Sequence, residues 1–392
     1  MKILAAGGGS GGHVTPVVAV LREIKTRDPH TEIRFWCDRK FAPQAKGIMA
    51  HFDESIRVDT IYSGKLRRYH QLSFIQQLLR VRTIVLPNLR DMGLVLVGFI
   101  QSVYKLVAWR PDVVFTKGGY VCLPIGYAAR LLGIPVVIHD SDAHPGLTNR
   151  LLAKWAHAIG TGAPLKYYPY PAHLAQYVGV PVLADFEPYS DEKRRAIKQK
   201  LGFSSSRPLI VVTGGGLGAQ RLNVAVAETL QNLLEYTNVM LISGEGQYDE
   251  MRSLTPQDDD RYQLHAFVSR GMADVLGAAD IVVARAGATT ILELAALAKP
   301  TILVPNAYLT GGHQLKNAAV YAEAQAVSVI DERKLEEAPI ILSEEVRAIL
   351  TDEPRRRAMA RAFHAFAKPN AARDMADLVL SAVTRDVDTS TA

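Results

Sequence analysis

The sequence predicts an α/β protein built from two doubly wound domains that face a central cleft. Two observations lead to this fold class. Short apolar runs alternate with helical patterns in both halves of the chain, which is typical of parallel sheets covered by helices. Each half also carries a glycine-rich turn directly after an apolar run, at residues 7–12 and 214–218. Such turns form the ligand-binding edge of a doubly wound sheet.

The length and composition agree with two globular domains. The 392 residues accommodate two domains of about 150–200 residues each. The contents of 48% apolar and 21% charged residues are ordinary for a globular protein. The two cysteines, Cys37 and Cys122, provide no disulfide framework, which favours a reducing cytosol. We expect no secretory signal, because the apolar start runs directly into glycines.

In the first half, the apolar runs that we interpret as strands lie at residues 1–6, 31–38, 56–58, 112–116 and 134–138. A helix is expected to open at Pro16, after the first glycine turn, because proline suits the first turn of a helix. Another is expected to end near Leu132, before Gly133.

The second half repeats the pattern. Its expected strands lie at residues 209–213, 239–243, 262–268, 281–283 and 301–305. We place a first domain at 1–165, a linker at 166–206, a second domain at 207–350, C-terminal helices at 351–385 and a frayed tail at 386–392. Whether the C-terminal helices cross back to the first domain stays open.

The first glycine turn predicts an anion site. Glycines let the backbone approach a phosphate closely, and the free amides and dipole of the next helix face the negative charge. His13 stands at the mouth of that helix, where a neutral imidazole can act as a general base. A hydrogen-bonding bystander is the alternative. Gly7, Gly9 and Gly12 also match the G-x-G-x-x-G dinucleotide fingerprint, a weak signal by itself.

Residues 61–110 form a basic and apolar segment. Their eight Lys or Arg and one Asp give a net charge of +7, against +6 for the whole chain. We expect two apolar helical patterns, separated near Pro87, whose uninterrupted apolar runs are shorter than the roughly 20 residues of a bilayer span. This mixture suits a helix pair lying on an anionic membrane surface. A core-facing pair with a solvated basic face is the alternative.

Polar residues follow the expected strand at 134–138. His139, Asp140 and Asp142 come just past its carboxyl end, where an open parallel sheet binds ligands. A metal site is one interpretation of this cluster. Because no further ligand set is evident in the sequence, ordinary loop polarity is favoured.

Together, the motifs resemble those of the bacterial MurG-type glycosyltransferases of family 28. These enzymes move N-acetylglucosamine from UDP-GlcNAc onto undecaprenyl-diphospho-N-acetylmuramoyl-pentapeptide (lipid I) to form lipid II for peptidoglycan. The resemblance implies the two-domain GT-B architecture, with the acceptor in the N-terminal half and the nucleotide sugar in the C-terminal half. The matching stretches, in the family's order, are residues 8–16, 118–121, 146–149, 214–223, 285–293 and 313–318.

The resemblance also implies roles for single residues. His13 is the candidate base for the acceptor's C4 hydroxyl, Glu293 takes the donor's ribose hydroxyls, and Val268 offers backbone groups to uracil. Arg285 offsets diphosphate charge, with an internal salt bridge as the alternative. The other implied donor residues are Ser10, Gly11, Gly12, Asp142, Gly215, Gly216, Gly218, Ala288, Thr289, Thr290, His313 and Gln314. The implied acceptor residues are Gly9, Gly118, Gly119, Tyr120 and Asn149.

The implied reaction is an inverting transfer in one displacement. It needs a base, an aligned acceptor and stabilisation of the leaving diphosphate, so no metal or other cofactor is expected. The implied partners are UDP-GlcNAc, undecaprenyl-linked lipid I, an anionic membrane surface and cell-wall synthesis machinery, with no nucleic acid. The implied location is the cytoplasmic face of the cell membrane, with peripheral attachment.

The chain departs from the family pattern at several positions. Asp142 stands in place of a sugar-facing amide, Leu183 in place of a donor-contacting arginine, and Gly216 and Leu217 in place of a serine and a glutamine. Three rival functions stay open. They are another UDP-sugar transferase with a lipid acceptor, a sugar-nucleotide-binding protein without catalysis, and an NAD-dependent oxidoreductase that uses Asp38 as its ribose acid.

Overall fold

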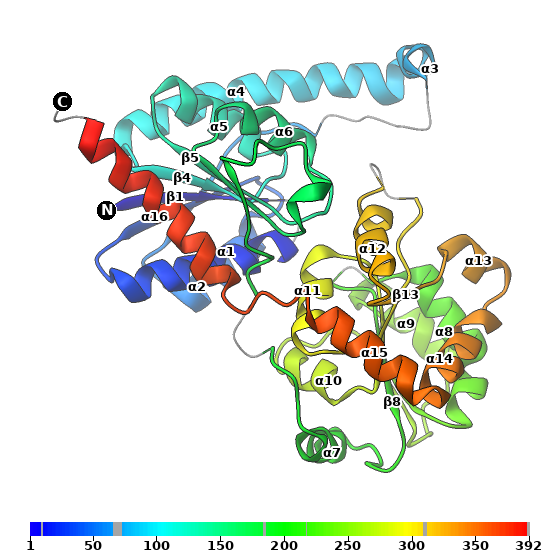
Figure 1. Ribbon diagram of the computed structural model, residues 1–392. Helices are drawn as coiled ribbons and strands as arrows, with labels where there is room; N and C mark the ends of the chain where they lie inside the picture. The colour runs from blue at the N-terminus through cyan, green and yellow to red at the C-terminus, as the bar shows by residue number, and fades with distance from the viewer. Residues whose placement is uncertain (9–10, 66–72, 183–185, 217, 309–311, 390–392) are drawn as a thin grey trace. The chain divides into compact units, whose positions relative to one another are not determined.

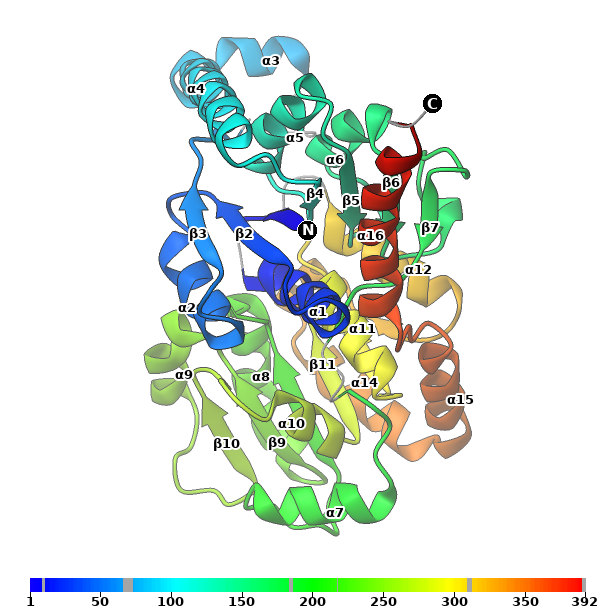
Figure 2. The same ribbon diagram turned by 90° about the vertical axis from the view of Figure 1, so that its left-hand side faces the viewer.

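The chain forms two compact units, one from Met1–Leu183 with Asn370–Ala392 and the other from Ala184–Pro369. Each unit holds a parallel sheet with helices on both faces (Figures 1 and 2). The computed structural model describes residues 1–8, 11–65, 73–182, 186–216, 218–308 and 312–389. Leu183 and Leu217, two of the departures from the family pattern, lie outside these described residues.

The first unit contains a seven-stranded parallel sheet in the order β3-β2-β1-β4-β5-β6-β7. Its strands are β1 (Lys2–Ala6), β2 (Glu32–Cys37), β3 (Arg57–Thr60), β4 (Val113–Thr116), β5 (Val136–Asp140), β6 (Ala158–Thr161) and β7 (Ala175–Tyr177). Its helices are α1 (Gly11–Arg27), α2 (Ala42–Phe52), α3 (Phe74–Leu79), the π-helix η1 (Val81–Val85), α4 (Leu86–Trp109), α5 (Cys122–Leu131), α6 (Leu147–Leu152), η2 (Ala153–Trp155), η3 (Leu165–Tyr167) and α16 (Ala371–Thr389).

The second unit contains a six-stranded parallel sheet in the order β10-β9-β8-β11-β12-β13. Its strands are β8 (Leu209–Thr213), β9 (Asn238–Ile242), β10 (Tyr262–His265), β11 (Ile281–Ala284), β12 (Thr301–Leu303) and β13 (Ser328–Val329). Its helices are α7 (Asp191–Lys200), α8 (Gln220–Leu234), η4 (Glu245–Gln247), α9 (Tyr248–Leu254), α10 (Met272–Ala278), α11 (Ala288–Ala296), α12 (His313–Glu323), α13 (Glu332–Glu337), α14 (Ile340–Thr351) and α15 (Glu353–His364).

The central strands are apolar on both faces because helices cover both sides of each sheet. In the first unit, Ile3, Ala5 and Phe115 pack into a cluster with α1, α2 and α16. Leu4 and Val114 point to the opposite face and pack into a second cluster with residues of α4 and α5. Figure 2 shows these two helices beside the sheet. The alternation of side chains along the strands thus builds two apolar cores around one sheet.

Helix α16 returns to the first unit after the chain has built the second. It runs along α1 (Figure 1), with Met375, Ala376, Val379 and Ala382 buried in the core shared with α1. Helix α16 continues to Thr389, so it includes residues 386–389 of the expected tail.

Two element boundaries differ from expectation for identifiable reasons. Helix α1 begins at Gly11 and contains Pro16, so the glycine turn itself winds into the first helical turn. Strand β5 extends through Asp140, because Asp140 pairs with Thr161 of β6, a strand the sequence did not reveal. His139 and Asp140 are therefore the last residues of the strand rather than part of the loop after it.

The expected break near Pro87 is also wrong. Pro87 lies in the first turn of α4, where a missing N–H is tolerated, and η1 joins α4 in one helical run, Val81–Trp109, of 29 residues. By length and composition alone this run is apolar enough to cross a membrane, with 22% of its most apolar window buried. One face of α4, including Gly98 and Leu106, packs on the first unit.

Candidate functional site

The strand order of the first unit reverses between the neighbouring strands β1 and β4. A doubly wound sheet binds ligands beyond the carboxyl ends of such a pair. The predicted residues Gly11, Gly12 and His13 form the first turn of α1 after β1, where amides have no partner within the helix. The His13 side chain lies outside what the structure describes, as do Gly9 and Ser10 entirely.

Gly118 and Gly119 form a turn directly after β4 that only glycine suits. Their φ angles are +88° and +89°, in the region that disfavours side chains. A Cβ on Gly119 would lie 3.1 Å from the Gly8 carbonyl oxygen, and one on Gly118 would lie 3.0 Å from Nδ2 of Asn149. The structure thus brings these three predicted acceptor residues together with Gly8.

Tyr120, the next predicted acceptor residue, interacts with Asp38 at the end of β2. Burial raises the pKa of the Tyr120 phenol to about 12, and the Asp38 carboxylate adds to this effect. Oδ1 of Asp38 accepts hydrogen bonds from the backbone amides of Lys40 and Phe41 at 3.0 and 3.2 Å. One oxygen of the proposed NAD-ribose acid is therefore engaged in its own turn.

A buried acidic group lies at the end of β5. Burial raises the pKa of Asp140 to about 7, although hydrogen bonds from Tyr170 and Asn149 lower it. The Tyr170 hydroxyl donates to Oδ2 of Asp140 at 2.8 Å. The predicted donor residue Asp142 follows two residues later and is partly exposed. Asn149 therefore connects this carboxylate to the turn at Gly118.

The metal interpretation of this cluster receives no support from its geometry. His139 Nε2 contacts the Gly179 carbonyl oxygen at 2.8 Å, and Nδ1 contacts the Ser141 hydroxyl at 3.3 Å. Both ring nitrogens are thus engaged in hydrogen bonds. Within the described ranges, no group of three or more His, Cys, Asp or Glu side chains is arranged to hold a metal ion.

In the second unit, the glycine turn after β8 is tightly built. A Cβ on Gly218, whose φ is +73°, would lie 2.2 Å from the Ser243 carbonyl oxygen. Gly215 has φ +77°, so it also favours glycine. A Cβ on Gly216 would meet nothing within 4 Å, so this position has room for the serine of the family pattern. Helix α8 begins shortly afterwards, at Gln220.

The predicted ribose ligand Glu293 lies on α11, whose N-cap residue is Gly287. Burial raises its pKa to about 7. Ala288, Thr289 and Thr290 form the first turn of the same helix, where amides are free to meet an anion. The structure therefore places these four predicted donor residues on one short helix.

Arg285 forms the internal salt bridge that the sequence left open as an alternative. Its Nη1 donates to the Val304 carbonyl oxygen at 2.9 Å, and its Nη2 pairs with Glu332. Glu332 is fully buried and also accepts from the amide of Ala307 at 2.9 Å. The guanidinium is thus committed to its own domain.

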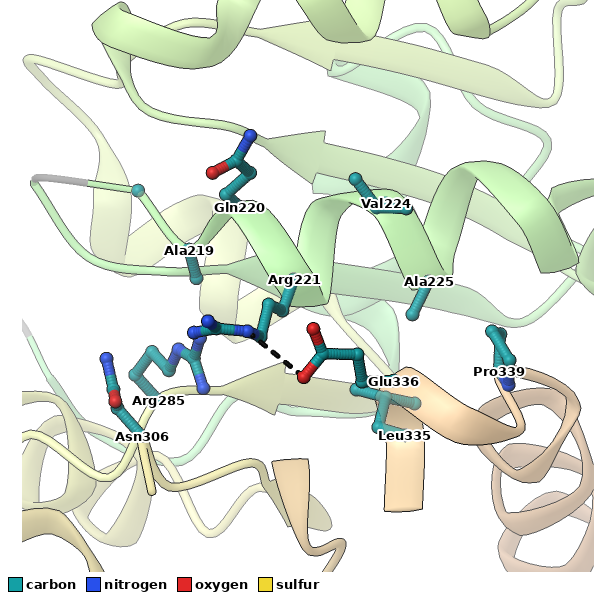
Figure 3. Close-up of a pocket in the computed structure, with 11 residues that line it drawn as sticks. Ala219, Gln220, Arg221, Val224, Ala225, Arg285, Asn306, Leu335, Glu336 and Pro339 are labelled. Carbon is teal, nitrogen blue, oxygen red and sulfur yellow. Dashed lines mark ion pairs between the residues drawn. The ribbon is translucent and has the colours of Figure 1, made fainter. Parts of the chain in front are cut away.

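A pocket of about 480 Å³ lies next to this salt bridge, between α8 and α13 (Figure 3). Arg285 and Asn306 line it beside Arg221, whose Nε lies 3.2 Å from Oε2 of Glu336. Figure 3 shows the Arg221 side chain extended between Arg285 and Glu336. The pocket is therefore lined by cations that are already paired with carboxylates.

The remaining predicted donor residues lie on separate segments of the second unit. Gln314, in the first turn of α12, accepts from the amide of Asn306 at 2.8 Å. Nδ1 of His313 is buried and has no hydrogen-bond partner within the described part of the chain. Strand β10 ends at His265, so Val268 lies in the loop after it rather than on the expected strand.

Several residues of these two polar edges escaped the sequence analysis. Lys117, Arg221, Glu332 and Asn306 were not singled out, although Lys117 directly precedes a recognised glycine turn and Arg221 lies within the matching stretch 214–223. For Lys117 and Arg221, the position next to or within these motifs was the signal that could have identified them. Glu332 had no such signal, because its partner Arg285 is 47 residues away.

Comparisons with known proteins agree on one family. Residues 3–161 match the N-terminal domain of glycosyltransferase family 28, and residues 209–378 match its C-terminal domain. A protein of Clostridium kluyveri named UDP-N-acetylglucosamine–N-acetylmuramyl-(pentapeptide) pyrophosphoryl-undecaprenol N-acetylglucosamine transferase is 32% identical over 337 residues, covering 85% of this chain and 87% of the relative. A protein of the same name from Exiguobacterium is 30% identical over 97% of this chain and 99% of the relative.

A solved structure shares the fold. The crystal structure of MurG from Acinetobacter baumannii aligns with a TM-score of 0.73 at 24% identity, over 97% of this chain and 99% of that one. The predicted GT-B fold is thereby confirmed. Two family-28 domains and relatives at 30% identity or above over nearly the whole chain show that this protein belongs to glycosyltransferase family 28, among the MurG-type N-acetylglucosamine transferases.

Proposed function

We propose that this chain transfers N-acetylglucosamine from UDP-GlcNAc to the C4 hydroxyl of undecaprenyl-linked N-acetylmuramoyl-pentapeptide, converting lipid I to lipid II. The observation that carries the proposal is the full-length relationship to transferases named for this acceptor and this sugar. The polar edges of the two sheets support it, since each offers glycine turns and free helix amides that suit a diphosphate.

In the proposed reaction the acceptor C4 oxygen forms a bond to the anomeric carbon as the bond to UDP breaks. His13 takes the hydroxyl proton, and UDP leaves as the diphosphate, so one displacement inverts the configuration. Gly9 of the first glycine turn, together with the turn at Gly118, Gly119 and Tyr120, holds the lipid diphosphate, and Asn149 positions the acceptor. This assignment agrees with the contact of Gly118 with Asn149.

The donor is assigned to the second unit. The turn at Gly215, Gly216 and Gly218 and the first turn of α11 hold the diphosphate through backbone amides. Glu293 accepts from the ribose hydroxyls, Val268 meets uracil through its backbone, and His313 with Gln314 meets the sugar hydroxyls. Ser10, Gly11, Gly12 and Asp142 are further residues that we assign to the donor. We expect the leaving diphosphate to need no metal or cofactor.

We further propose that α4 holds the protein peripherally on the cytoplasmic face of an anionic membrane. One face of α4 packs on the first unit, and the other presents apolar side chains to solvent. Arg80, Arg82 and Arg90 are exposed beside it. This combination suits a helix lying in the membrane interface. The exposed apolar residues are Leu86, Leu89, Met92, Leu96, Val97, Ile100, Tyr104 and Val107.

One assay tests the proposed function. Labelled UDP-GlcNAc and a short-chain lipid I analogue are incubated with the protein, with and without EDTA, and the product linkage is determined. We expect a β-linked disaccharide product and equal rates in both samples. Transfer of a different sugar would favour another UDP-sugar transferase, and UDP binding without turnover would favour a binding protein.

A further inference from the structure

Lys117 is a buried lysine to which the proposed transfer gives no task. It is the first residue after β4, and only 3% of its surface is exposed. Its ammonium donates a hydrogen bond to the hydroxyl of Ser141. A buried ammonium is costly unless opposite charges and hydrogen bonds compensate it, so its neighbours should reveal what maintains it.

Two carboxylates act electrostatically on the ammonium, Asp140 at the end of β5 and Asp142 two residues later. Burial lowers the pKa of Lys117 to about 8, while Asp142 and then Asp140 raise it. Among the described residues, His139 of β5 contacts Ser141, the Tyr170 hydroxyl contacts Asp140, and the Cys122 thiol of α5 donates to the Gly118 carbonyl oxygen at 3.0 Å. Burial raises the pKa of Cys122 to about 12, so this thiol stays neutral near pH 8.

The directions of the hydrogen bonds agree with a donor at Lys117. The Gly179 carbonyl can only accept, so Nε2 of His139 donates to it at 2.8 Å. In the neutral imidazole Nδ1 is then an acceptor, and the Ser141 hydroxyl donates to it at 3.3 Å. The Ser141 oxygen can then accept the hydrogen bond from Lys117. This hydroxyl is neutral, so the charge of Lys117 is compensated by the two carboxylates.

The position of this cluster gives the charge a function. Lys117 directly precedes the turn at Gly118 and Gly119, to which we assign the lipid diphosphate. With a charged Lys117, one of the two carboxylate charges that act on Lys117 is cancelled. With a neutral Lys117, both would face an incoming dianion, and such repulsion is strong in a poorly solvated site.

We propose that Lys117 is a positioning residue of the acceptor site, whose ammonium cancels the charge of Asp142 next to the glycine turn that Lys117 precedes and thereby permits the turn to bind the acceptor diphosphate. The inference rests on the proposed function. It explains how this chain accommodates a carboxylate at position 142, where the family pattern has an amide.

The test compares wild type with Lys117→Met, Asp142→Asn and the double variant. The kcat/KM for a lipid I analogue is measured from pH 6.5 to 9.5 at saturating UDP-GlcNAc. For wild type we expect kcat/KM to fall as the pH rises through about 8 and Lys117 loses its proton. Lys117→Met should be roughly 10- to 100-fold lower at pH 7 and should lose this alkaline fall. The double variant should recover most of the loss, because neither charge remains.

Asp142→Asn alone gives an independent test of the inference, which can still be carried out if Lys117→Met does not fold. Because Asp142 raises the pKa of Lys117, we expect the alkaline fall to move to lower pH in this variant. Lys25→Met is the matched control, since Lys25 pairs with Asp53 at 3.2 Å elsewhere in the first unit. It should leave the pH profile of acceptor use unchanged.

The outcomes separate this inference from the proposed function. A wild-type protein that transfers no sugar to the lipid I analogue refutes the function and, with it, the inference. Active wild type together with an unaltered acceptor KM and alkaline fall in Lys117→Met overturns the inference alone. So does a double variant that is as impaired as Lys117→Met, because the effect would then not depend on Asp142.

Discussion

Lys117 and Arg285 occupy equivalent positions in the two units. Each is the first residue after the strand that pairs with the glycine-turn strand of its sheet, β4 beside β1 and β11 beside β8. Each donates its backbone N–H to the end of that neighbouring strand, Lys117 to Ala6 at 3.0 Å and Arg285 to Thr213 at 3.3 Å. Each unit therefore has a buried cation at this position of its sheet.

The two cations differ in what they can do. Arg285 is held by Glu332 and the Val304 carbonyl, and a guanidinium does not lose its proton in proteins. Lys117 faces two carboxylates, and burial lowers its pKa to about 8. The second unit thus has a fixed structural charge where the first has a charge that responds to pH. The following predictions test this division.

The largest effect should come from His13, because we place the base on the first unit. His13→Ala should lower kcat by about 10²–10⁴-fold and leave UDP affinity nearly unchanged, since UDP is assigned to the second unit. Steady-state kinetics and calorimetric UDP titration measure the two quantities. His30→Ala, at an exposed histidine, is the control. Weaker UDP binding with normal turnover would contradict the assignment.

Breaking the fixed charge pair should affect stability rather than pH dependence. Glu332→Gln leaves the Arg285 guanidinium buried without its counter-charge, which should lower the free energy of unfolding by about 3–5 kcal/mol. Urea denaturation measures this change. Arg357→Gln removes an exposed pair with Glu353 and should cost about 0–1 kcal/mol. Equal losses in the two variants would show that the buried pair has no special structural role.

Glu293 tests whether the second unit also contains a titrating group. Its pKa is raised to about 7 by burial, and ribose hydroxyls favour the ionised carboxylate. UDP binding near pH 7 should therefore lower this pKa and release protons, as titration calorimetry in buffers of different ionisation enthalpy can detect. Glu293→Ala should weaken UDP binding by about 1–3 kcal/mol and abolish the release. The exposed Glu228, changed to Gln, should do neither.

The smallest effect per residue is expected for membrane binding by the basic side chains on and beside α4. These side chains are a feature of the first unit. Each arginine near an anionic membrane contributes about 1 kcal/mol, so Glu at Arg80, Arg82 and Arg90 together should reduce co-sedimentation with anionic vesicles. Neutral vesicles and a variant with Glu at three exposed arginines of the second unit, Arg333, Arg357 and Arg361, are controls. Unchanged sedimentation of the α4 variant would count against the interfacial role.

The sequence predicted the features whose causes are local. Glycine turns, apolar strands and helix starts are determined by nearby residues, so the doubly wound units and most strands were predictable. Strand β6 and the extension of β5 to Asp140 depend on pairing between strands, which local patterns do not reveal. The Arg285–Glu332 pair spans 47 residues, and the contact of Lys117 with Ser141 spans 24. The assigned roles of the site residues stay predictions.

The position of α16 has a consequence for biosynthesis. Because Met375, Val379 and Ala382 complete the apolar layer over α1, the first half of the polypeptide emerges from the ribosome long before its own last helix has been made. The apolar surface of α1 therefore stays without its α16 cover while the intervening 184–369 segment is translated. Attempts to express the two halves as separate fragments should therefore supply residues 370–392 to the N-terminal one.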